Sequence, residues 1–394
     1  MKTWHEALNL LLENLTPLPP ETVELSKSAG RFLQSPACAA GDAPAFDVSM
    51  MDGYAIGDKA LVGREFSLFG TNIPGELPGQ PVRSDEARRI FTGAAVPDHA
   101  VQVVPEELVE ITEDGKIRVL EIPNSRFIRR RASEAQAGDV MIAKGHQLRA
   151  AEMSILASLG VAEPIVGKRP RVAHLVLGNE LIDPALTPER GQIRDSNSIL
   201  IRSLLEENSA DLVFHCRLED DAAGIVSALT AAKAVADMIL VSGGASVGEH
   251  DHARGSLRTA GFSFLFEKIN LRPGRPTAVG IAGNQVAICL PGNPLAHLAV
   301  FHLLVRPALQ KLAGAADLRT EFHRSPLAHA IPGHPNSRAT FWPATLRPDG
   351  LHPLRFLSSG DLLAVAGVNA MIALEPNAPL PAVGETIPFL SLLV

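Results

Sequence analysis

The segment of this sequence best suited to bind an anion runs Ser242-Gly243-Gly244-Ala245-Ser246-Val247-Gly248-Glu249-His250-Asp251. Paired glycines directly after a buried strand let backbone amides approach an anion closely, as in phosphate-binding nests. Asp251, at the far end, is placed to hold a divalent cation over that anion. The alternative is a tight crossover turn with an acid at its surface. His250 and His252 flank Asp251, but two such residues on a loop do not define zinc geometry, so we expect no zinc site there.

Two further segments have the composition of anion-binding loops. Leu290-Pro291-Gly292-Asn293-Pro294 puts a glycine and a potential cap where a strand leads into a helix, whose first N–H groups are free and whose dipole is positive there. Lys268-Ile269-Asn270-Leu271-Arg272-Pro273-Gly274-Arg275-Pro276 surrounds a rigid turn with three cations. At about 4 Å each cation attracts a unit negative charge by roughly 4 kcal/mol at an effective dielectric near 20, before desolvation. The alternatives are an ordinary helix cap and a solvated charged surface.

Carboxylates that could assist such chemistry are scattered along the chain: Asp52, Glu180, Asp195, Asp220, Asp221 and Asp251. We expect Glu180, Asp195 and Asp251 to lie on loops that face one crevice, and oxygen ligands of this kind suit magnesium bridging phosphates. Each alone is equally consistent with a helix cap or a surface acid, and Asp195 fits a cap well. No Ser-His-Asp arrangement or GxGxxG motif supports a hydrolase or a dinucleotide-binding protein.

The elements that must position these loops alternate between strand and helix. Apolar runs predict strands over 172–177, 211–218, 238–242 and 286–290. Helices are predicted over 197–207 with a Ser196/Asn197 cap, over 222–236, and over 295–312 with Asn293 as cap and Pro294 in its first position. This alternation indicates a three-layer α/β domain with a mostly parallel sheet. Ligands bind at the carboxyl ends of such strands, so the loops at 178–180, 243–251 and 291–294 are the candidate site.

The rest of the chain predicts several smaller parts around this α/β domain. Thr3-Trp4-His5-Glu6 forms a capping box for a helix with an apolar face, and a second helix over 150–159 ends at Gly160. Short β-branched runs between Gly/Pro turns predict an inserted β domain, and the tail predicts a small C-terminal β domain. The expected division is 1–44 with 145–168 as an N-terminal linking domain, 45–144 as the inserted β domain, 169–316 as the α/β domain, and 317–394 as a C-terminal β-barrel-like domain.

Composition excludes several classes of protein. A net charge of -7 and 5% aromatic residues argue against nucleic-acid binding, and no apolar stretch is long enough to span a membrane. The cysteines Cys38, Cys216 and Cys289 are far apart and form no CxxC pair, which excludes a zinc ribbon or a disulfide framework. We therefore expect a cytoplasmic location.

Together these segments resemble the molybdopterin molybdotransferase family, the MoeA-type proteins that include the C-terminal domain of gephyrin. The resemblance covers nearly the whole chain in order: Phe46-Asp47 through Asp52-Gly53-Tyr54-Ala55, Thr92-Gly93-Ala94, Gly145-His146, Gly178-Asn179-Glu180-Leu181, Asp195-Ser196-Asn197, Ser242-Gly243-Gly244 through Asp251, Pro273-Gly274-Arg275-Pro276 and Leu290–Pro294. It implies a homodimer whose active sites each lie between one subunit's α/β domain and the partner's β domain. It also implies that molybdate is inserted into adenylylated molybdopterin with release of AMP, assisted by a divalent cation, here Mg²⁺.

The resemblance also implies roles for particular residues. Catalytic acids would be Asp52, Glu180, Asp220 and Asp251, of which Glu180 and Asp251 would hold the metal. The molybdopterin substrate would contact Thr92, Arg129, Asp195, Ser196, Asn197, Gly243, Gly244, Ser246, Pro291, Gly292, Asn293 and Pro294. Molybdate would be bound by Lys268, Arg272, Arg275, Arg338 and Ser359. The molybdopterin adenylyltransferase is an expected partner, since it makes the substrate.

This sequence departs from the family pattern at four places. The family's Gly-Asp-Glu reads Gly178-Asn179-Glu180, and the Gly-Glu-Asp that follows an arginine run reads Ala132-Ser133-Glu134. Both lysines of the usual Lys-Pro-Gly-Lys-Pro are arginines, Arg272 and Arg275, which keep the charge and can bind an oxyanion bidentately. The usual Gly-Ser-Gly reads Ser358-Ser359-Gly360. The alternatives are therefore a non-catalytic paralogue that binds molybdopterin or scaffolds a partner, and the single-domain adenylyltransferase, against which the extra β domains argue.

Overall fold

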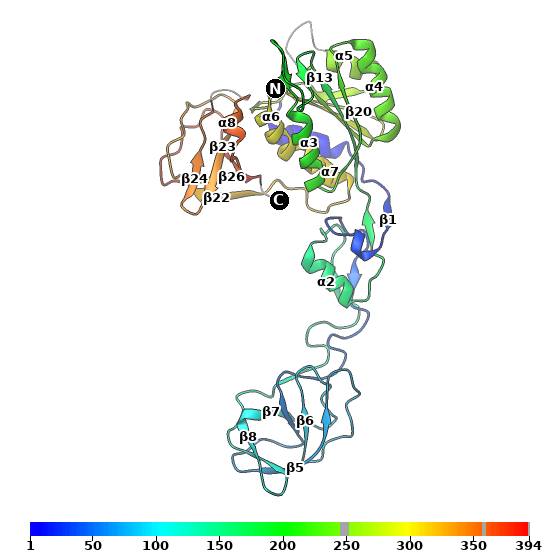
Figure 1. The fold of residues 1–394 in the computed structure, drawn as a ribbon, viewed down its shortest axis with the longest axis vertical. Helices are drawn as coiled ribbons and strands as arrows, with labels where there is room; N and C mark the ends of the chain where they lie inside the picture. Colours follow the sequence, from blue (N-terminus) through cyan, green and yellow to red (C-terminus); the bar gives the residue numbers. More distant parts are fainter. Residues whose placement is uncertain (245–251, 357–359, 393–394) are drawn as a thin grey trace. The chain divides into compact units, whose positions relative to one another are not determined.

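Residues 1–244, 252–356 and 360–392 of the chain are described by a computed structural model (Figure 1). The chain forms two compact units. One contains Met1–Ser35, Lys144–Ser154 and Ala162–Val394, and the other contains Pro36–Ala143 and Ile155–Val161. Among the helices that this description includes, none combines the length and apolar composition of a membrane-spanning segment.

The first unit begins with helix α1 (Trp4–Glu13), which starts at the predicted capping box. The Thr3 hydroxyl accepts a hydrogen bond from the Glu6 N–H at 3.2 Å, and the Glu6 carboxylate accepts one from the Thr3 N–H at 2.8 Å. These bonds satisfy two amides that the helix itself leaves unpaired. Leu8 and Leu11 of this helix are buried, so its apolar face packs into the core as the sequence predicts.

A six-stranded mixed sheet forms the centre of this unit, in the order β16-β13-β17-β21-β20-β18. Its strands are β13 (Arg171–Leu177), β16 (Asp211–Leu218), β17 (Met238–Ser242), β18 (Ser263–Phe266), β20 (Ala278–Ala282) and β21 (Gln285–Leu290). The first four in spatial order are parallel, whereas β20 pairs antiparallel with both β21 and β18. The four strands predicted from apolar runs are the four parallel ones. Three of them, β13, β17 and β21, are buried almost throughout, and strands buried on both faces need continuous apolar sequence.

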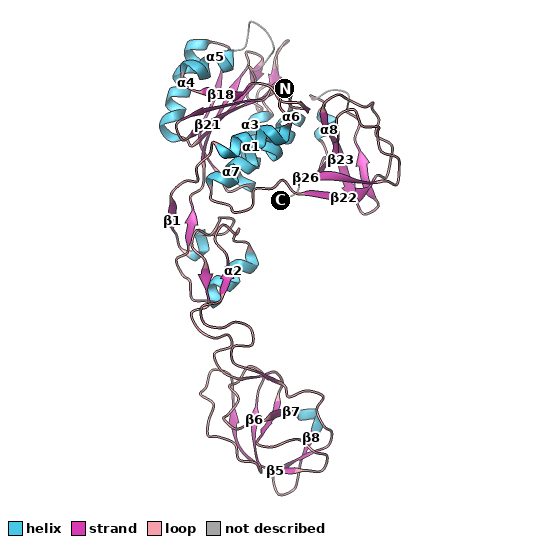
Figure 2. Cartoon of the chain, turned by 180° about the vertical axis from the view of Figure 1, so that it is seen from behind, coloured by secondary structure: helices cyan, strands magenta, loops and turns pink. Residues whose placement is uncertain are grey.

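Helices cover both faces of this sheet (Figures 1 and 2). On one face α4 (Ala222–Val235) and α5 (His252–Thr259) pack in one core with strand residues such as Ile239 and Val241. On the other face α3 (Asn197–Glu207) and the helical segment that follows β21 pack with α1 and with Leu240 and Ile288. Successive strand residues thus pack into the cores on opposite faces of the sheet, because side chains of a strand point alternately to its two faces.

The predicted single helix over 295–312 is wrong in one respect. Helix α6 (Pro294–Val300) is followed by a π-helical segment η3 (Phe301–Val305) and then by α7 (Arg306–Leu312). Pro307 explains the interruption, because it has no N–H to donate to the carbonyl of Leu303 and its ring crowds that carbonyl. Wider π turns of this kind accommodate such a break within a helix.

The C-terminal part of this unit is a second six-stranded sheet. It contains β22 (Phe322–Pro326), β23 (Ala339–Arg347), β24 (Gly350–Pro353), β25 (Ala370–Leu374), β26 (Thr386–Ser391) and, from the α/β part, β19 (Leu271–Arg272). Helix α8 (Leu362–Val365) precedes β25. The short strand β19 pairs with β23 in parallel, with Leu271 opposite Ala339 and Arg272 opposite Thr340.

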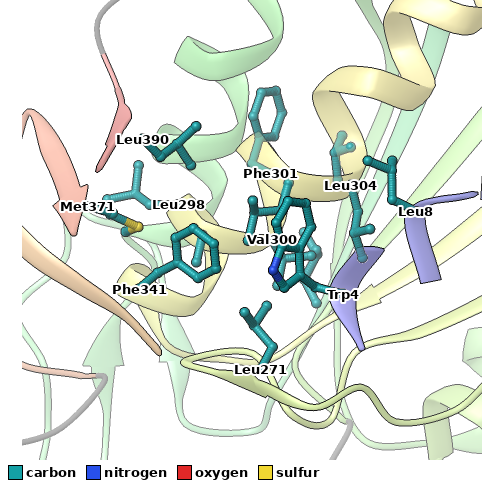
Figure 3. Packing of buried hydrophobic residues seen from close by; sticks show 14 of the residues in the cluster. Trp4, Leu8, Leu271, Leu298, Val300, Phe301, Leu304, Phe341, Met371 and Leu390 are labelled. Carbon is teal, nitrogen blue, oxygen red and sulfur yellow. The ribbon is translucent and has the colours of Figure 1, made fainter. Parts of the chain in front are cut away.

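One hydrophobic core joins the α/β part to this C-terminal sheet (Figure 3). Trp4 of α1 meets Phe341 of β23 edge to face, with ring centroids 5.8 Å apart. Leu298 of α6 and Met371 of β25 belong to the same buried cluster. Each fully buried apolar side chain of this size contributes about 1.5–3 kcal/mol, so the two parts stabilise one another.

Short elements connect the α/β part to the rest of the chain. They are β1 (Pro20–Thr22), η1 (Leu25–Lys27), α2 (Ala150–Ser158) and β12 (Ile165–Gly167). Within the α/β part, the segment between β13 and α3 forms the parallel pair β14 (Leu181–Ile182) and β15 (Ile193–Arg194). Strands β1 and β12 pair antiparallel. The predicted helix over 150–159 is α2, and Gly160 just beyond it has φ +73°, as a helix-ending glycine requires.

The second unit is a β domain, as its Gly/Pro-punctuated sequence predicts. Its sheet has the order β7-β4-β6-β5-β9-β8. These strands are β4 (Gly53–Ile56), β5 (Glu65–Asn72), β6 (Glu86–Ile90), β7 (Gln102–Pro105), β8 (Val109–Ile111) and β9 (Lys116–Val119), with η2 (Glu106–Leu108) before β8. Two small antiparallel pairs join β3 (Val48–Ser49) to β10 (Ile128–Arg129) and β2 (Ala37–Cys38) to β11 (Val140–Ile142).

Candidate functional site

Four loops that carry predicted site residues follow the carboxyl ends of four adjacent parallel strands. Glu180 follows β13, Asp220 follows β16, Gly243 follows β17, and the segment 291–293 follows β21. The spatial order β16-β13-β17-β21 makes these strands neighbours, so their loops gather at one edge of the sheet. This edge is where open α/β sheets bind ligands.

Gly243 and Gly244 are placed where no other residue fits. Their φ angles are +84° and +62°. A Cβ on Gly243 would lie 2.3 Å from the carbonyl oxygen of Leu177, and one on Gly244 would lie 2.8 Å from a methyl carbon of the same leucine. A Cβ on Gly292 would be 3.9 Å from the Cα of Gly243, so the loops after β17 and β21 touch. The predicted residues Ser246 and Asp251 lie outside the described part of the chain.

The segment before α3 is attached to this pair of loops. Asn197, which is buried, donates its side-chain N–H to the carbonyl of Gly292 at 2.8 Å. Ser196 is the N-cap residue of α3, as predicted, but its side chain makes no capping hydrogen bond. Asp195 performs this role instead: one carboxylate oxygen accepts the Ser198 N–H at 3.0 Å and the other accepts the Ser198 hydroxyl.

A buried hydrogen-bond network that the sequence does not indicate lies directly behind the glycine loop. The Ser242 hydroxyl is 2.7 Å from Nε2 of His174 on β13 and 2.7 Å from Nε2 of His297 on α6. His297 Nδ1 is 3.0 Å from the carbonyl of Asn293, which can only accept, so Nδ1 carries the proton. Nε2 of His297 therefore accepts from Ser242, and Ser242 accepts from His174. This network connects β13, β17 and the start of α6.

Both histidines of this network are neutral at pH 7. Burial lowers the pKa of His297 to about 4, although the Asn293 carbonyl and Asp195 act in the opposite direction. Burial, followed by repulsion from His297 and His215, lowers the pKa of His174 well below its usual value. Asn293 is the N-cap residue of α6 with Pro294 in the first position, as predicted, but its side chain makes no capping bond and its carbonyl holds the network instead.

The loops after β13 and β16 are also joined. The Asp220 N–H donates to the side-chain oxygen of Asn179 at 3.0 Å, and Asp221 caps α4 by accepting from the Gly224 N–H at 2.7 Å. Glu180 is exposed at this edge. The asparagine that departs from the family pattern thus makes a contact that an aspartate oxygen would also make.

Three arginines gather where β19 meets β23. Arg338 immediately precedes β23, and its pKa is lowered by burial and then by the charges of Arg272 and Arg275. Arg272 is half-buried with its guanidinium 5.5 Å from the ring centre of Phe356. Lys268 is half-buried before them in the chain, and the predicted Ser359 lies beyond the described residues. Arg275 is exposed, whereas Arg272 and Arg338 are half-buried, and repulsion among such cations marks a place where an anion would be stabilised.

The turn that carries Arg275 packs against α5 and α6, the helices that follow the two glycine-containing loops. Arg254 of α5 donates to the Pro276 carbonyl at 2.9 Å. A Cβ on Gly274 would lie 3.0 Å from a methyl group of Val300 on α6. Gly244 leads toward α5, and the segment 291–293 leads into α6. The basic turn and the glycine loops are therefore linked through these two helices.

The three candidate residues of the second unit form two contacts of their own. The Asp52 carboxylate accepts hydrogen bonds from the Thr92 N–H and the Thr92 hydroxyl, both at 2.7 Å, and these bonds lower its pKa. Arg129 pairs with Glu134 at 2.7 Å. Asp52 is therefore held as a carboxylate on an exposed surface.

The described residues do not supply a complete set of metal ligands. Among them, no group of three His, Cys, Asp or Glu side chains is placed to hold a metal ion. Glu180 and Asp220 are exposed oxygen donors on neighbouring loops, and such donors suit Mg²⁺. The donor chemistry fits magnesium, and the third predicted acid, Asp251, belongs to the segment outside the description.

The fold and this edge define a class of protein: an α/β domain with glycine-containing loops at the carboxyl ends of its parallel strands, joined to a C-terminal β sheet and a separate β domain. Residues 2–160 match the family described as "MoeA N-terminal region (domain I and II)", and residues 173–311 match "Probable molybdopterin binding domain". The chain belongs to the MoeA family of molybdopterin molybdenumtransferases.

The relatives that carry this name are similar in sequence to most of the chain. The molybdopterin molybdenumtransferase of Haemophilus influenzae is 34% identical over 332 residues, covering 83% of this chain and 82% of the relative. That of Staphylococcus aureus strain Mu50 is 31% identical over 392 residues, covering 97% and 93%. The crystal structure of the molybdopterin biosynthesis moeA protein from Pyrococcus horikoshii OT3 has a TM-score of 0.84 at 25% identity, covering 99% of this chain and 100% of that one.

Proposed function

We propose that this chain inserts molybdate into adenylylated molybdopterin and releases AMP, which completes the molybdenum cofactor. The observation that carries the proposal is the three-arginine cluster, in a family member whose glycine loops gather at the ligand-binding edge of the sheet. A tetrahedral metal-oxide dianion and a phosphate ester are the two anions that this reaction must bring together. The chain provides a separate group of donors for each.

The phosphate side uses backbone N–H groups. Gly243 and Gly244 have adjacent left-handed conformations that turn the chain sharply at the end of β17. The Gly243 N–H donates to the Leu290 carbonyl at 3.3 Å, so the anion would be bound by the amides of the loop that follows it. The segment Pro291–Pro294 adds the start of α6, with Asn197 fixing the Gly292 carbonyl. We assign Asp195, Ser196 and Ser246 to the same substrate contact, because they flank these loops in the sequence.

The molybdate side uses cations. Arg272, Arg275 and Arg338 repel one another in the absence of an anion, so a dianion removes an unfavourable interaction as well as forming a favourable one. At about 4 Å and an effective dielectric near 20, each contact contributes roughly 4 kcal/mol before desolvation. Lys268 and Ser359 complete this assignment.

The acids would serve the adenylate. Glu180 and Asp251 would hold Mg²⁺, which when bound offsets charge that develops on the phosphate oxygens. Asp220, whose backbone is fixed by Asn179, lies on the neighbouring loop. We assign Asp52, Thr92 and Arg129 to the same reaction from the β domain of a partner copy in a homodimer. Thr92 keeps Asp52 ionised at neutral pH.

Two broader features of the proposal follow from the whole chain. We propose a four-domain division at 1–44 with 145–168, 45–144, 169–316 and 317–394, in which the first part dimerises. We also propose a cytoplasmic enzyme, for which the wide separation of Cys38, Cys216 and Cys289 along the sequence is support. The molybdopterin adenylyltransferase would deliver its product to this enzyme.

The decisive experiment supplies purified protein with adenylylated molybdopterin, Mg²⁺ and molybdate and measures AMP. We expect molybdate-dependent AMP release and formation of a cofactor that activates an apo-molybdoenzyme. A non-catalytic paralogue, suggested by the departures at Asn179 and Ala132–Glu134, would bind the substrate without releasing AMP. Complementation of a strain that lacks the transferase separates the two possibilities in the cell. The contacts of Asn179 and Glu134 favour catalysis, since both departures keep an oxygen acceptor in place.

A further inference from the structure

A second polar cavity lies in the first unit, away from the glycine loops. Its volume is about 740 Å³, within the range of small-molecule sites. It is lined by α7 and the preceding π segment, by the segment 145–149, by residues 317–323, and by the end of β26. The α6–α7 helix starts at the candidate active site with Pro294, and Arg306 is twelve residues further, about 18 Å along a helix axis. The cavity is therefore separate from the proposed reaction centre.

The cavity wall contains polar atoms that have no hydrogen-bond partner within the described structure. His302 of the π segment is 2% exposed, yet neither ring nitrogen is hydrogen-bonded to a described residue. The Thr320 hydroxyl is likewise buried without such a partner. Leaving a buried polar group unsatisfied costs about 1–3 kcal/mol, so atoms of this kind indicate an occupant that supplies the missing bonds.

Two arginines face this cavity without a neutralising carboxylate. Burial lowers the pKa of Arg306, and the charge of Arg149 lowers it further, with Glu321 opposing. Within the described ranges, neither Arg149 nor Arg306 forms an ion pair, whereas Arg319 on the same wall is neutralised by Asp317 at 2.5 Å. Arg306 is partly buried and Arg149 is exposed, and an anion between two such like charges stabilises both.

The backbone around the cavity is firmly held. The Ala316 N–H donates to the Gly145 carbonyl at 3.1 Å, and the Gly145 N–H donates to the Leu33 carbonyl at 2.6 Å. A Cβ on Gly145 would lie only 2.5 Å from the Cβ of Ala316, which explains the glycine with its φ of +80°. These contacts hold the segments around Gly145 and Ala316, which are far apart in the sequence, side by side in the cavity wall.

We propose that this cavity is a binding site for a small phosphate-type oxyanion, distinct from the substrate site. Arg149 and Arg306 supply the charge, because paired guanidinium groups match the geometry of a tetrahedral oxyanion. His302 and Thr320 supply neutral donors beneath it. Glu321 also lines the cavity, and its negative charge opposes part of the attraction that the two arginines exert on an anion.

Calorimetric titration of the full-length protein with inorganic phosphate tests the proposal. The Arg272→Gln/Arg275→Gln background weakens phosphate binding at the proposed molybdate site. The glycine loops remain as a second phosphate site in that background, so the binding that belongs to the cavity is the part that substitutions in the cavity wall remove. In that background we expect Arg306→Gln and Arg149→Gln each to weaken phosphate binding at least tenfold. Arg202→Gln, which removes the same charge from the exposed face of α3, is the matched control and should change the affinity less than twofold.

His302→Phe fills the same volume without ring nitrogens and should weaken phosphate binding several-fold without lowering the free energy of unfolding. Ribose 5-phosphate in a parallel titration distinguishes a phosphate monoester, which would bind more tightly than phosphate, from the free ion. A cavity filled only with water would show no phosphate binding in the double-variant background, or binding that Arg149→Gln leaves unchanged, and either result overturns the proposal. AMP release is not part of this readout, so failure here leaves the proposed transferase activity unaffected.

Discussion

Ser242→Ala tests the buried network behind the glycine loop. The substitution removes one hydroxyl and, with it, two hydrogen bonds of 2.7 Å. It leaves the Nε2–H of His174 and the Nε2 lone pair of His297 buried without partners, at about 1–3 kcal/mol each. We therefore expect the free energy of unfolding to fall by about 3 kcal/mol, far more than the loss of one oxygen from a surface serine.

Urea denaturation followed by tryptophan fluorescence measures this change in the unit that contains the network. Both tryptophans, Trp4 and Trp342, belong to the unit and core cluster that contain this sheet. Ser227→Ala on the exposed side of α4 is the matched control and should change the free energy of unfolding by less than 0.5 kcal/mol, as is typical for a surface site. A double-mutant cycle with His297→Leu should give a coupling of about 0.5–3 kcal/mol. A loss below about 1 kcal/mol, or strictly additive variants, would show that the network does not stabilise the fold.

Three more predictions concern acid stability, oxyanion binding and the glycine loop. Burial lowers the pKa values of His297 and His302 to about 4 in the folded chain, so between pH 6.5 and 4 the unfolded chain binds more protons. The free energy of unfolding should therefore decrease as the pH falls through this window, by on the order of 3 kcal/mol per histidine. Urea titrations at several pH values measure this change. A free energy of unfolding that stays constant with pH would mean that the two histidines are accessible to solvent. Arg338→Ala should raise the molybdate concentration for half-maximal AMP release roughly 5- to 150-fold, corresponding to about 1–3 kcal/mol, while saturating molybdate restores the rate; an unchanged molybdate requirement contradicts the assignment. Gly243→Ala places a Cβ 2.3 Å from a carbonyl oxygen of β13 at a φ of +84°, so it should destabilise the protein by at least about 1–2 kcal/mol in thermal unfolding, whereas Gly255→Ala in α5, where the added carbon meets nothing within 4 Å, should not.

The sequence predicts the α/β elements well because their signals are local. Strand β17 is apolar over Met238–Val241, and such a run identifies a strand covered on both faces. The Thr3–Glu6 capping box lies within four residues, so the start of α1 can also be predicted from the sequence. Placing the loops at one sheet edge then follows from the parallel connection rule, without knowledge of any side-chain contact.

What the sequence does not predict depends on contacts between distant segments. His174 and His297 are separated by more than a hundred residues, and nothing near either one indicates that both reach Ser242. The sequence allows a capping bond from either Asp195 or Ser196, and which of the two adjacent side chains turns toward the helix is decided by the fold. Pro307 is a visible signal for the π segment, since a proline inside a helix pattern demands local rearrangement.

The short strand pair β19–β23 has a thermodynamic consequence. It brings Arg272 from the α/β part beside the segment that carries Arg338 from the C-terminal sheet, so the two guanidinium groups meet only while that sheet is docked. Any oxyanion held by both must bind the docked form in preference to the open one. Linkage then requires that the ligand tighten the docking by RT ln(1 + [L]/Kd), about 2.7 kcal/mol at a hundredfold excess over Kd. Protease sensitivity of the connection near residue 316 would consequently report ligand occupancy.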